Sequence, residues 1–349
     1  MRKKKNKVIR IGSINIGGSY PVAIQTMTKT LTTDVEATIE QIRRVQELGC
    51  HIVRIAVQDE KGLTAFKKIR KEVNIPLVAD IHFDYILAIK SIEAGADKIR
   101  INPGNIGDKK KIKEILKVAK EKDVAIRIGI NSGSLEKSLL KKYGQSSLEA
   151  MVESAINTVK YFEDNEFNNI VISLKANDVK RTVEAYRMIS DKIDYPLHIG
   201  ITEAGTVFSG TIKSAIGIGI LLYEGIGDTI RVSLSAEPEE EVRVGYEILK
   251  ALEMYREIPV IIACPTCSRA EIDVVSIANE IEAKIANIKK NIRVAVMGCV
   301  VNGPGEAIEA DIGITGTKDN AVIFKKGRIF KNIPKSKIVE ILLEEIKKL

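Results

Sequence analysis

The sequence is poor in Trp, His and Cys, and it has no long apolar run. It contains no Trp, three His and four Cys among 349 residues, and its best apolar stretch, Ala215 to Tyr223, is far too short to cross a bilayer. The basic start, Met1 to Lys7, is followed by a charged strand-like stretch rather than by an apolar secretory core. These features predict a cytoplasmic protein. The apolar content of 45%, rich in Ile and Val, indicates a globular α/β chain.

The small number of cysteines and the positive charge narrow the range of functions. In a reducing compartment, four cysteines are better explained as metal ligands, catalytic groups or core residues than as disulfides. The formal net charge of +8 favours an anionic partner. No basic patch is interleaved with aromatic residues, so we expect neither a nucleic acid nor a membrane as partner, but a small phosphate compound.

Short β-branched runs alternate with amphipathic helical stretches, which is typical of βα units on a parallel sheet. Eight such units in about 230 residues predict an N-terminal TIM (β/α)8 barrel. The predicted strands are Pro21 to Met27, His51 to Val57, Ile75 to Ile81, Lys98 to Asn102, Ala125 to Asn131, Asn169 to Ala176, Leu197 to Glu203 and Thr229 to Ser235. The predicted helices begin near Asp34, Glu60, Asp84, Lys109, Ser146, Asp178, Thr211 and Pro238. Val8 to Ser19 is predicted to form a hairpin at the barrel floor.

The pattern changes after Tyr255. We therefore predict two domains, a barrel over residues 1–254 that binds the substrate and a smaller α/β domain over residues 255–349. The second domain carries three of the four cysteines. Its predicted elements are a strand at Val260 to Ala263, a long helix at Arg269 to Lys289, a strand at Arg293 to Met297, a Gly-rich loop and a hairpin around Gly327.

Five cationic residues fall on the predicted barrel strands, where branched apolar residues are usual. They are Arg54, Arg100, Arg127, Lys175 and Arg231. The alternation of side chains along a strand adds Asn102, Asn131 and Ser233 to the same polar faces. Cations that converge on one barrel mouth repel one another unless an anion neutralises them, so we expect a diphosphate or a sugar phosphate. The alternative is that single cations pair with carboxylates or point outward.

Three acidic or imidazole side chains at strand ends are candidates for proton transfer. Glu203, in the segment ITEAG, is the better acid/base candidate. Asp80 and His82 are candidates for acid/base or supporting roles, and a hydrogen bond in the core explains His82 equally well. The loop Ala204 to Gly210 leads into a helix N-terminus, which favours phosphate. His198 is interpreted as structural, and His51 begins a predicted strand on the opposite face.

The cysteines indicate a metal centre. Cys264 and Cys267 form a CxxC motif, which fits a dithiol, half of a zinc site or two ligands of an iron-sulfur cluster. Cys299 follows another predicted strand, and a third cysteine favours the metal site. Cys50 lies near the barrel floor, so the fourth position falls to a weaker ligand, for which Glu306 is the nearest candidate. A carboxylate-held iron is open to ligand exchange, whereas a structural zinc site with the same four residues is the alternative.

Ten segments in the same order resemble those of the bacterial two-domain 4-hydroxy-3-methylbut-2-enyl diphosphate synthase family. The likeness spans nearly the whole chain. The segments are QTMT from Gln25, VRIAV from Val53, ADIHFDY from Ala79, KIRINPGN from Lys98, RIGINSGS from Arg127, SLKAND from Ser173, HIGITEAG from His198, GIGDTIRVSL from Gly225, CPTCSR from Cys264 and MGCVVNGPGE from Met297.

The resemblance implies a reductive ring opening. In this family, 2-C-methyl-D-erythritol 2,4-cyclodiphosphate takes up two electrons and loses water to give the allylic diphosphate of the non-mevalonate isoprenoid route. The resemblance also implies one 4Fe-4S cluster per subunit, electrons from flavodoxin or ferredoxin, and a homodimer in which the cluster domain of one subunit covers the barrel of the other. The implied cluster ligands are Cys264, Cys267, Cys299 and Glu306.

The resemblance also assigns roles to barrel residues. It implies that Glu203 is the proton donor. The residues implied to hold the diphosphate are Arg54, Arg100, Arg127, Lys175 and Arg231, with Asn131 and Ser233 nearby. Two positions depart from the family pattern, Ser268 and Asn177. A rival interpretation is a Schiff-base sugar-phosphate aldolase that uses Lys175 and has a structural zinc site.

Overall fold

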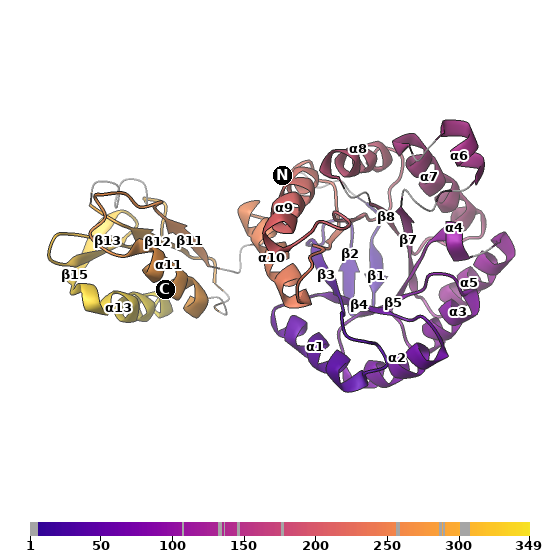
Figure 1. Ribbon diagram of the computed structural model, residues 1–349, viewed down its shortest axis with the longest axis horizontal. Coiled ribbons are helices and arrows are strands. Elements are labelled where there is room, and N and C mark those ends of the chain that lie inside the picture. Colours follow the sequence, from indigo (N-terminus) through magenta and orange to yellow (C-terminus); the bar gives the residue numbers. More distant parts are fainter. Residues whose placement is uncertain are drawn as a thin grey trace. The chain divides into compact units, whose positions relative to one another are not determined.

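A computed structural model describes residues 6–106, 108–131, 135, 137–144, 147–175, 178–255, 259–285, 288, 290–300 and 308–349 (Figure 1). The chain divides into two compact units, Met1–Leu252 and Glu253–Leu349. Among the described residues, no helix combines the length and the apolar character that crossing a membrane requires.

The first unit is a parallel barrel of eight strands, as the sequence predicts. The order β8-β7-β6-β5-β4-β3-β10-β9 follows the chain around the sheet, and a bridge between Ile172 and Leu197 joins β8 to the segment before β9. Each of the eight predicted strands is present. They are β3 (Ala23–Met27), β4 (Ile52–Ala56), β5 (Leu77–Asp80), β6 (Lys98–Ile101), β7 (Ala125–Asn131), β8 (Ile170–Lys175), β9 (His198–Ile199) and β10 (Thr229–Ile230).

Helices surround the barrel strands (Figure 1). They are α1 (Val35–Glu47), α2 (Glu60–Glu72), α3 (Tyr85–Glu93), α4 (Pro103–Ile106), α5 (Lys109–Glu121), α6 (Lys137–Tyr143), α7 (Leu148–Asp164), α8 (Val179–Ser190), α9 (Val207–Tyr223) and α10 (Pro238–Ala251). Asp and Ser side chains cap many N-termini, as when Asp34 accepts a hydrogen bond from the Ala37 amide.

Three features of these helices differ from the prediction. The short helices α4 and α6 were not predicted, and α9 begins at Val207, four residues before Thr211. Gly210 suggested a loop but lies within α9. A Cβ atom there would come 2.5 Å from Leu234 Cδ2, so close packing rather than chain reversal explains this glycine.

An antiparallel hairpin closes the barrel floor, which confirms that prediction. Its strands are β1 (Ile9–Ile11) and β2 (Ile14–Ile16). The buried side chains of the hairpin pack against early residues of five barrel strands. This cluster consists of Ile9, Ile11, Ile16, Ala23, Ile52, Val78, Ala125 and Val171.

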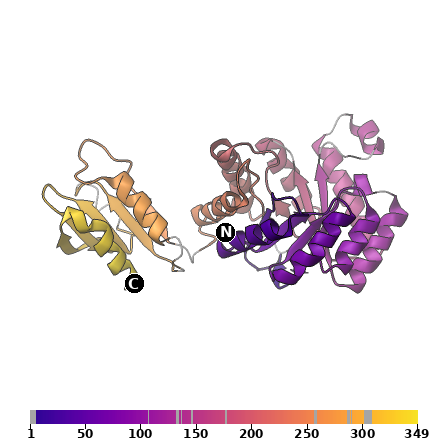
Figure 2. The same cartoon turned by 60° about the horizontal axis from the view of Figure 1, so that its bottom comes forward.

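The second unit is a five-stranded mixed sheet with two helices on one face, drawn in orange and yellow in Figure 2. The strand order is β11-β12-β13-β14-β15, in which β11 to β13 are parallel and the last three are antiparallel neighbours. The elements are β11 (Val260–Ala263), α11 (Val274–Ile285), β12 (Arg293–Met297), β13 (Ile312–Gly316), β14 (Ala321–Lys325), β15 (Arg328–Ile333), the 3-10 turn Lys335–Lys337 and α13 (Ile338–Lys347).

The sequence predicted β11, β12 and the hairpin at Gly327, but not β13 or α13. It also predicted too long a helix, because α11 begins only at Val274. Asp273 accepts a hydrogen bond from the Ser276 amide there, so this residue caps the helix.

Candidate functional site

The barrel interior above the floor is polar. On β3, β4, β5 and β7 the floor residues are Ala23, Ile52, Val78 and Ala125. Because alternate side chains share a face, the next inward-facing residues, two positions further along each strand, are Gln25, Arg54, Asp80 and Arg127. Three of these are 1 to 3% exposed, namely Gln25, Asp80 and Arg127. Barrel interiors are usually filled by branched apolar residues, so this polar layer is the candidate functional site.

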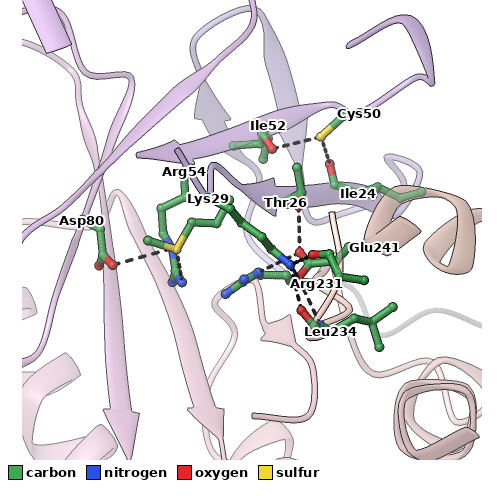
Figure 3. Close-up of polar contacts among 12 residues, drawn as sticks. Ile24, Thr26, Lys29, Cys50, Ile52, Arg54, Asp80, Arg231, Leu234 and Glu241 are labelled. Carbon is green, nitrogen blue, oxygen red and sulfur yellow. Dashed lines mark hydrogen bonds and ion pairs between the residues drawn. The ribbon is translucent and has the colours of Figure 1, made fainter. Parts of the chain in front are cut away.

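Asp80 connects the cations on one side of the mouth. Its Oδ2 lies 3.7 Å from Arg54 Nε and 3.4 Å from His82 Nε2. Its Oδ1 lies 3.4 Å from Arg100 Nη1, which is also 3.4 Å from the His82 ring nitrogen. The structure therefore brings together four residues that the sequence analysis singled out separately. Figure 3 shows Arg54 and Asp80 on neighbouring strands.

Burial and charge act in opposite directions on this group. Burial by itself raises the pKa of Asp80, but Arg54, the His82 hydrogen bond, Arg100 and Arg127 together hold that pKa well below its usual range. Asp80 thus stays ionised near neutral pH, which favours a supporting role over proton donation. Burial, and then neighbouring arginines, lower the pKa of Arg54 to about 10 and that of Arg127 well below its usual range.

Glu241 forms a second polar cluster beside the end of β3 and the segment after β10, and it was not found by sequence reasoning. It is 1% exposed and accepts hydrogen bonds from Thr26 Oγ1 at 2.8 Å, the Leu234 amide at 3.1 Å and Arg231 Nε at 3.4 Å (Figure 3). Lys29 Nζ lies 3.2 Å from the same carboxylate. Glu241 belongs to the run EEE at the start of α10, which reads in the sequence as a solvated helix end.

Lys29 is a second residue that the sequence analysis missed. Its Nζ donates to the Leu234 carbonyl at 2.7 Å and to the Ala236 carbonyl, in addition to its ion pair with Glu241. An ammonium group has three donors, and all three have protein partners here. Lys29 therefore fastens the segment after β10 rather than facing a ligand.

Glu203 lies in the loop between β9 and α9 and is exposed. Its φ of +53° places a residue with a Cβ in the left-handed region. Such a conformation costs free energy for a residue with a Cβ, and strained residues of this kind can mark functional sites. This backbone conformation agrees with a functional role for Glu203, whose role in proton transfer stays a prediction.

The other predicted barrel residues lie on the same strands or just after them. Asn102 is 3% exposed and its Oδ1 accepts from the Gly104 amide at 3.1 Å, and Ser233 is half-buried after β10. Asn131 and Lys175 are register partners on β7 and β8, but their side chains lie outside the described part of the structure. Asn177 also lies outside the described residues.

The two remaining histidines have structural contacts, which agrees with the interpretation of His198. His198 is fully buried with Nδ1 2.8 Å from Thr229 Oγ1, and His51 Nδ1 accepts from the Ile24 amide at 3.1 Å. Cys50 lies just before β4, where its Sγ is 3.2 Å from the Ile52 carbonyl oxygen.

The three other cysteines lie at one edge of the second sheet. Cys264 follows β11 and Cys299 follows β12, and these strands are parallel neighbours with Ala263 opposite Val296. All three thiols are free, with Cys267 exposed and the other two partly buried. The Gly298 amide donates to Cys264 Sγ at 3.2 Å, a contact that suits a thiolate ligand.

The three thiols are chemically suitable ligands for an iron-sulfur cluster. Soft thiolates are the ligands of iron-sulfur clusters, and the tight approach of Gly316 to the Gly298 carbonyl, where a Cβ would lie at 2.6 Å, keeps the chain close around Cys299. Within the described ranges, no three His, Cys, Asp or Glu residues are close enough for one metal ion. A cluster with one ligand per iron holds its ligands farther apart than a single ion does. Glu306 lies outside the described residues.

Two family models cover almost the whole chain. Residues 6–246 match the GcpE TIM-barrel domain, and residues 260–348 match the GcpE protein C-terminal domain. The chain belongs to the GcpE family. This confirms the family resemblance and the fold that the sequence predicted.

Curated relatives of this GcpE chain are similar over their full length. One from Caldanaerobacter subterraneus subsp. tengcongensis is 59% identical over 99% of this chain and 98% of its own. Another from Geobacillus thermodenitrificans is 55% identical over 100% and 93%, and one from Clostridium perfringens is 55% identical over 99% of both chains. Each is named 4-hydroxy-3-methylbut-2-en-1-yl diphosphate synthase (flavodoxin).

Solved structures resemble the GcpE chain in fold alone. Dihydropteroate synthase from Stenotrophomonas maltophilia has a TM-score of 0.53 at 13% identity and covers 70% of this chain and 97% of its own. The Yersinia pestis enzyme of the same name has a TM-score of 0.51 at 11% identity, with 70% and 98% covered. These similarities support the barrel and carry no functional argument.

The carboxylate of Asp80 should dominate the stability of the GcpE barrel. Replacing Asp80 with Asn is expected to lower the free energy of unfolding by about 3–5 kcal/mol near neutral pH, because the buried arginines lose their counter-charge. Folding lowers the pKa of Asp80. Its contribution to the free energy of unfolding is therefore complete above the unfolded pKa of about 3.9 and is lost as the pH falls from there through the folded pKa. Urea unfolding at several pH values measures the difference between variant and wild type, which should shrink in acid.

A matched control is Glu60→Gln on α2. That substitution breaks an exposed ion pair with Lys90 and should cost less than about 1 kcal/mol. Equal unfolding midpoints for Asp80→Asn and Glu60→Gln would contradict the role assigned to Asp80.

Proposed function

We propose that this GcpE chain converts 2-C-methyl-D-erythritol 2,4-cyclodiphosphate to (E)-4-hydroxy-3-methylbut-2-enyl diphosphate in the non-mevalonate isoprenoid pathway. The substrate dianion takes up two electrons and one proton and gives the product trianion and one water. The full-length relatives that carry the synthase name support this function, and they do not favour the Lys175 aldolase alternative. The structural observation that carries the proposal is the excess of buried cations in the barrel.

The count of charges in the mouth favours a bound anion. Four described arginines face two buried carboxylates, and a further cation, Lys29, is tied to one of these. Arg127 Nε and Nη1 and Arg100 Nε are buried with no hydrogen-bond partner among the described residues. Buried donors without partners are costly, so a diphosphate that accepts from them is stabilising. The proposed substrate-binding residues are Arg54, Arg100, Asn102, Arg127, Asn131, Lys175, Arg231 and Ser233.

The residues of the barrel have distinct tasks in this reaction. Glu241 accepts a hydrogen bond from Arg231 Nε and so orients that guanidinium. Arg54 is held by its ion pair with Asp80 and by hydrogen bonds from Nε and Nη2 to Met27 Sδ. Glu203 gives its carboxyl proton to the substrate hydroxyl oxygen that leaves as water. The exposed position of Glu203 lets solvent restore that proton.

Cys264, Cys267, Cys299 and Glu306 would hold the 4Fe-4S cluster of each subunit. When bound, the cluster supplies the two electrons one at a time, and flavodoxin, which is part of the relatives' name, or ferredoxin delivers them. The four free thiols of the chain suit the reducing cytoplasm, where we place the enzyme.

The decisive experiment is anaerobic purification followed by visible and electron paramagnetic resonance spectroscopy with iron analysis. We expect one 4Fe-4S cluster per subunit and reduction of the cyclodiphosphate with reduced flavodoxin. A colourless, iron-free protein that is nevertheless active would exclude the proposed chemistry.

A homodimer is the proposed assembly, and the exposed face of α9 supports it. A stripe of apolar side chains follows this helix, and the largest are Phe208, 80% exposed, and Tyr223, 68% exposed. The other members are Val207, Ile212, Ile216 and Ile220. An apolar stripe of this kind marks an interaction surface, and two copies related by a two-fold axis would cover one another.

Replacing Ile216 with Lys should weaken this dimer, because it places a charge in the centre of the apolar stripe. We expect sedimentation velocity at micromolar concentration to show a shift from dimer to monomer. Val8→Lys is the matched control, since Val8 is 52% exposed but lies beside the hairpin at the barrel floor. An Ile216→Lys protein that remains as dimeric as wild type would rule out this surface.

A further inference from the structure

Lys98 is a buried cationic residue to which the proposed reaction assigns no task. It begins β6, is fully buried, and has Val78 and Ala125 as register neighbours on β5 and β7. Its Nζ donates to Gln25 Oε1 at 3.1 Å. Gln25 lies on β3, which is not a neighbour of β6 in the sheet, so this hydrogen bond crosses the barrel interior.

The surroundings of Lys98 lack a counter-charge. Among the described residues no carboxylate forms an ion pair with Lys98, and Gln25 is the one hydrogen-bond partner of its three possible donors. The charged groups on the facing elements are Arg54 on β4 and Arg127 on β7, both cations. Asp80 on β5 is occupied by Arg54, Arg100 and His82, and the hairpin at the floor contributes isoleucines.

A buried ammonium in this position is therefore unfavourable. Burial first, and then Arg127 and Arg54, lower the pKa of Lys98 well below its usual range. A neutral amine needs no counter-charge and still donates to Gln25.

We propose that Lys98 is a proton-binding site coupled to the anion site, an amine in the free barrel and an ammonium when the diphosphate is bound. The inference rests on the proposed function for the identity of the anion. An anion seated on Arg54 and Arg127 cancels the charges that disfavour the ammonium, and the proton comes from solvent. Because binding linkage is reciprocal, protonation of Lys98 also strengthens anion binding.

Isothermal titration calorimetry measures this coupling directly. The cyclodiphosphate is titrated at about pH 7.5 in buffers that differ in ionisation enthalpy, and the slope of binding enthalpy against ionisation enthalpy gives the protons taken up. The ligand itself has no group that titrates near neutral pH. We expect wild type to take up close to one proton per ligand and Lys98→Met to take up none.

Two controls separate this inference from its alternatives. Two other side chains at the mouth could bind a proton, His82 and the proposed proton donor Glu203, so His82→Gln and Glu203→Gln must each retain the uptake. Sulfate, fully ionised at this pH, serves as a second probe. The coupling is overturned if wild type binds either anion without taking up a proton. It is also overturned if Lys98→Met takes up as many protons as wild type.

The two probes also distinguish the proposals from each other. Uptake with sulfate but no binding of the cyclodiphosphate supports the role of Lys98 and contradicts the proposed function. Failure of both anions to bind overturns both proposals.

Stability provides a test that needs no ligand. A lysine with a depressed pKa in the folded state binds more protons when unfolded, so wild-type stability should rise with pH up to the unfolded lysine pKa of about 10.4. Lys98→Met should be more stable than wild type at neutral pH, with a gain that shrinks as the pH rises. Lys61→Met, on the exposed side of α2, should show no such change, and a Lys98→Met gain independent of pH would contradict an uncharged Lys98.

Discussion

Replacing Cys299 with Ala is expected to abolish synthase activity and remove the cluster spectrum, while the barrel still binds the cyclodiphosphate. The reason is that one of three thiolates is lost from a site whose fourth ligand is a weaker carboxylate. Cys299 leaves β12 directly beside the strand that precedes Cys264, so no other described cysteine can replace it. Iron analysis, visible absorbance and calorimetry with the cyclodiphosphate measure the three parts of this prediction.

Cys50→Ala is the matched control. Cys50 is buried in the barrel, and burial raises its pKa to about 12, which keeps it a thiol rather than a metal-binding thiolate. The control should retain full iron content and activity. A Cys299→Ala protein with wild-type iron and turnover would remove Cys299 from the ligand set.

Replacing Glu203 with Gln is expected to lower turnover by about 10²–10⁴-fold while leaving the cluster spectrum and substrate affinity unchanged. The amide keeps the size of the side chain but has no acidic proton to give to the leaving oxygen. Steady-state assays with reduced flavodoxin measure turnover, and electron paramagnetic resonance monitors the cluster.

Glu166→Gln controls for the unusual backbone at Glu203. Glu166 is also an exposed glutamate in the left-handed region, with φ of +56°, but it precedes β8 and so lies at the floor end of the barrel. We expect it to have wild-type turnover. Equal turnover for the two variants would show that Glu203 is not the proton donor.

The sequence predicted the barrel and the strands that carry its cations because both depend on local periodicity. Alternation along β4, β6, β7 and β10 suffices to place the arginines on inward faces. The same reasoning found Asp80 and His82 but not the distances that unite them with Arg54 and Arg100.

Local periodicity did not predict the contacts that connect distant parts of the chain. Glu241 meets Thr26 across 215 positions of sequence, and Lys29 reaches the segment after β10 across 205. Neither residue belongs to a periodic pattern that marks it as buried. The missed strand β13 has the sequence IGITG, and its two glycines weaken the strand signal. Gly313 is needed there because a Cβ would lie 2.3 Å from Phe324.

The hairpin at the barrel floor affects the direction of the electric field that the buried arginines produce outside the barrel. Its isoleucines form a low-dielectric base beneath the polar layer, so the field of the arginines is focused through the open end. An approaching dianion is then guided to the mouth before it makes any contact. The association rate of the substrate should accordingly exceed that of an uncharged analogue and fall as ionic strength rises.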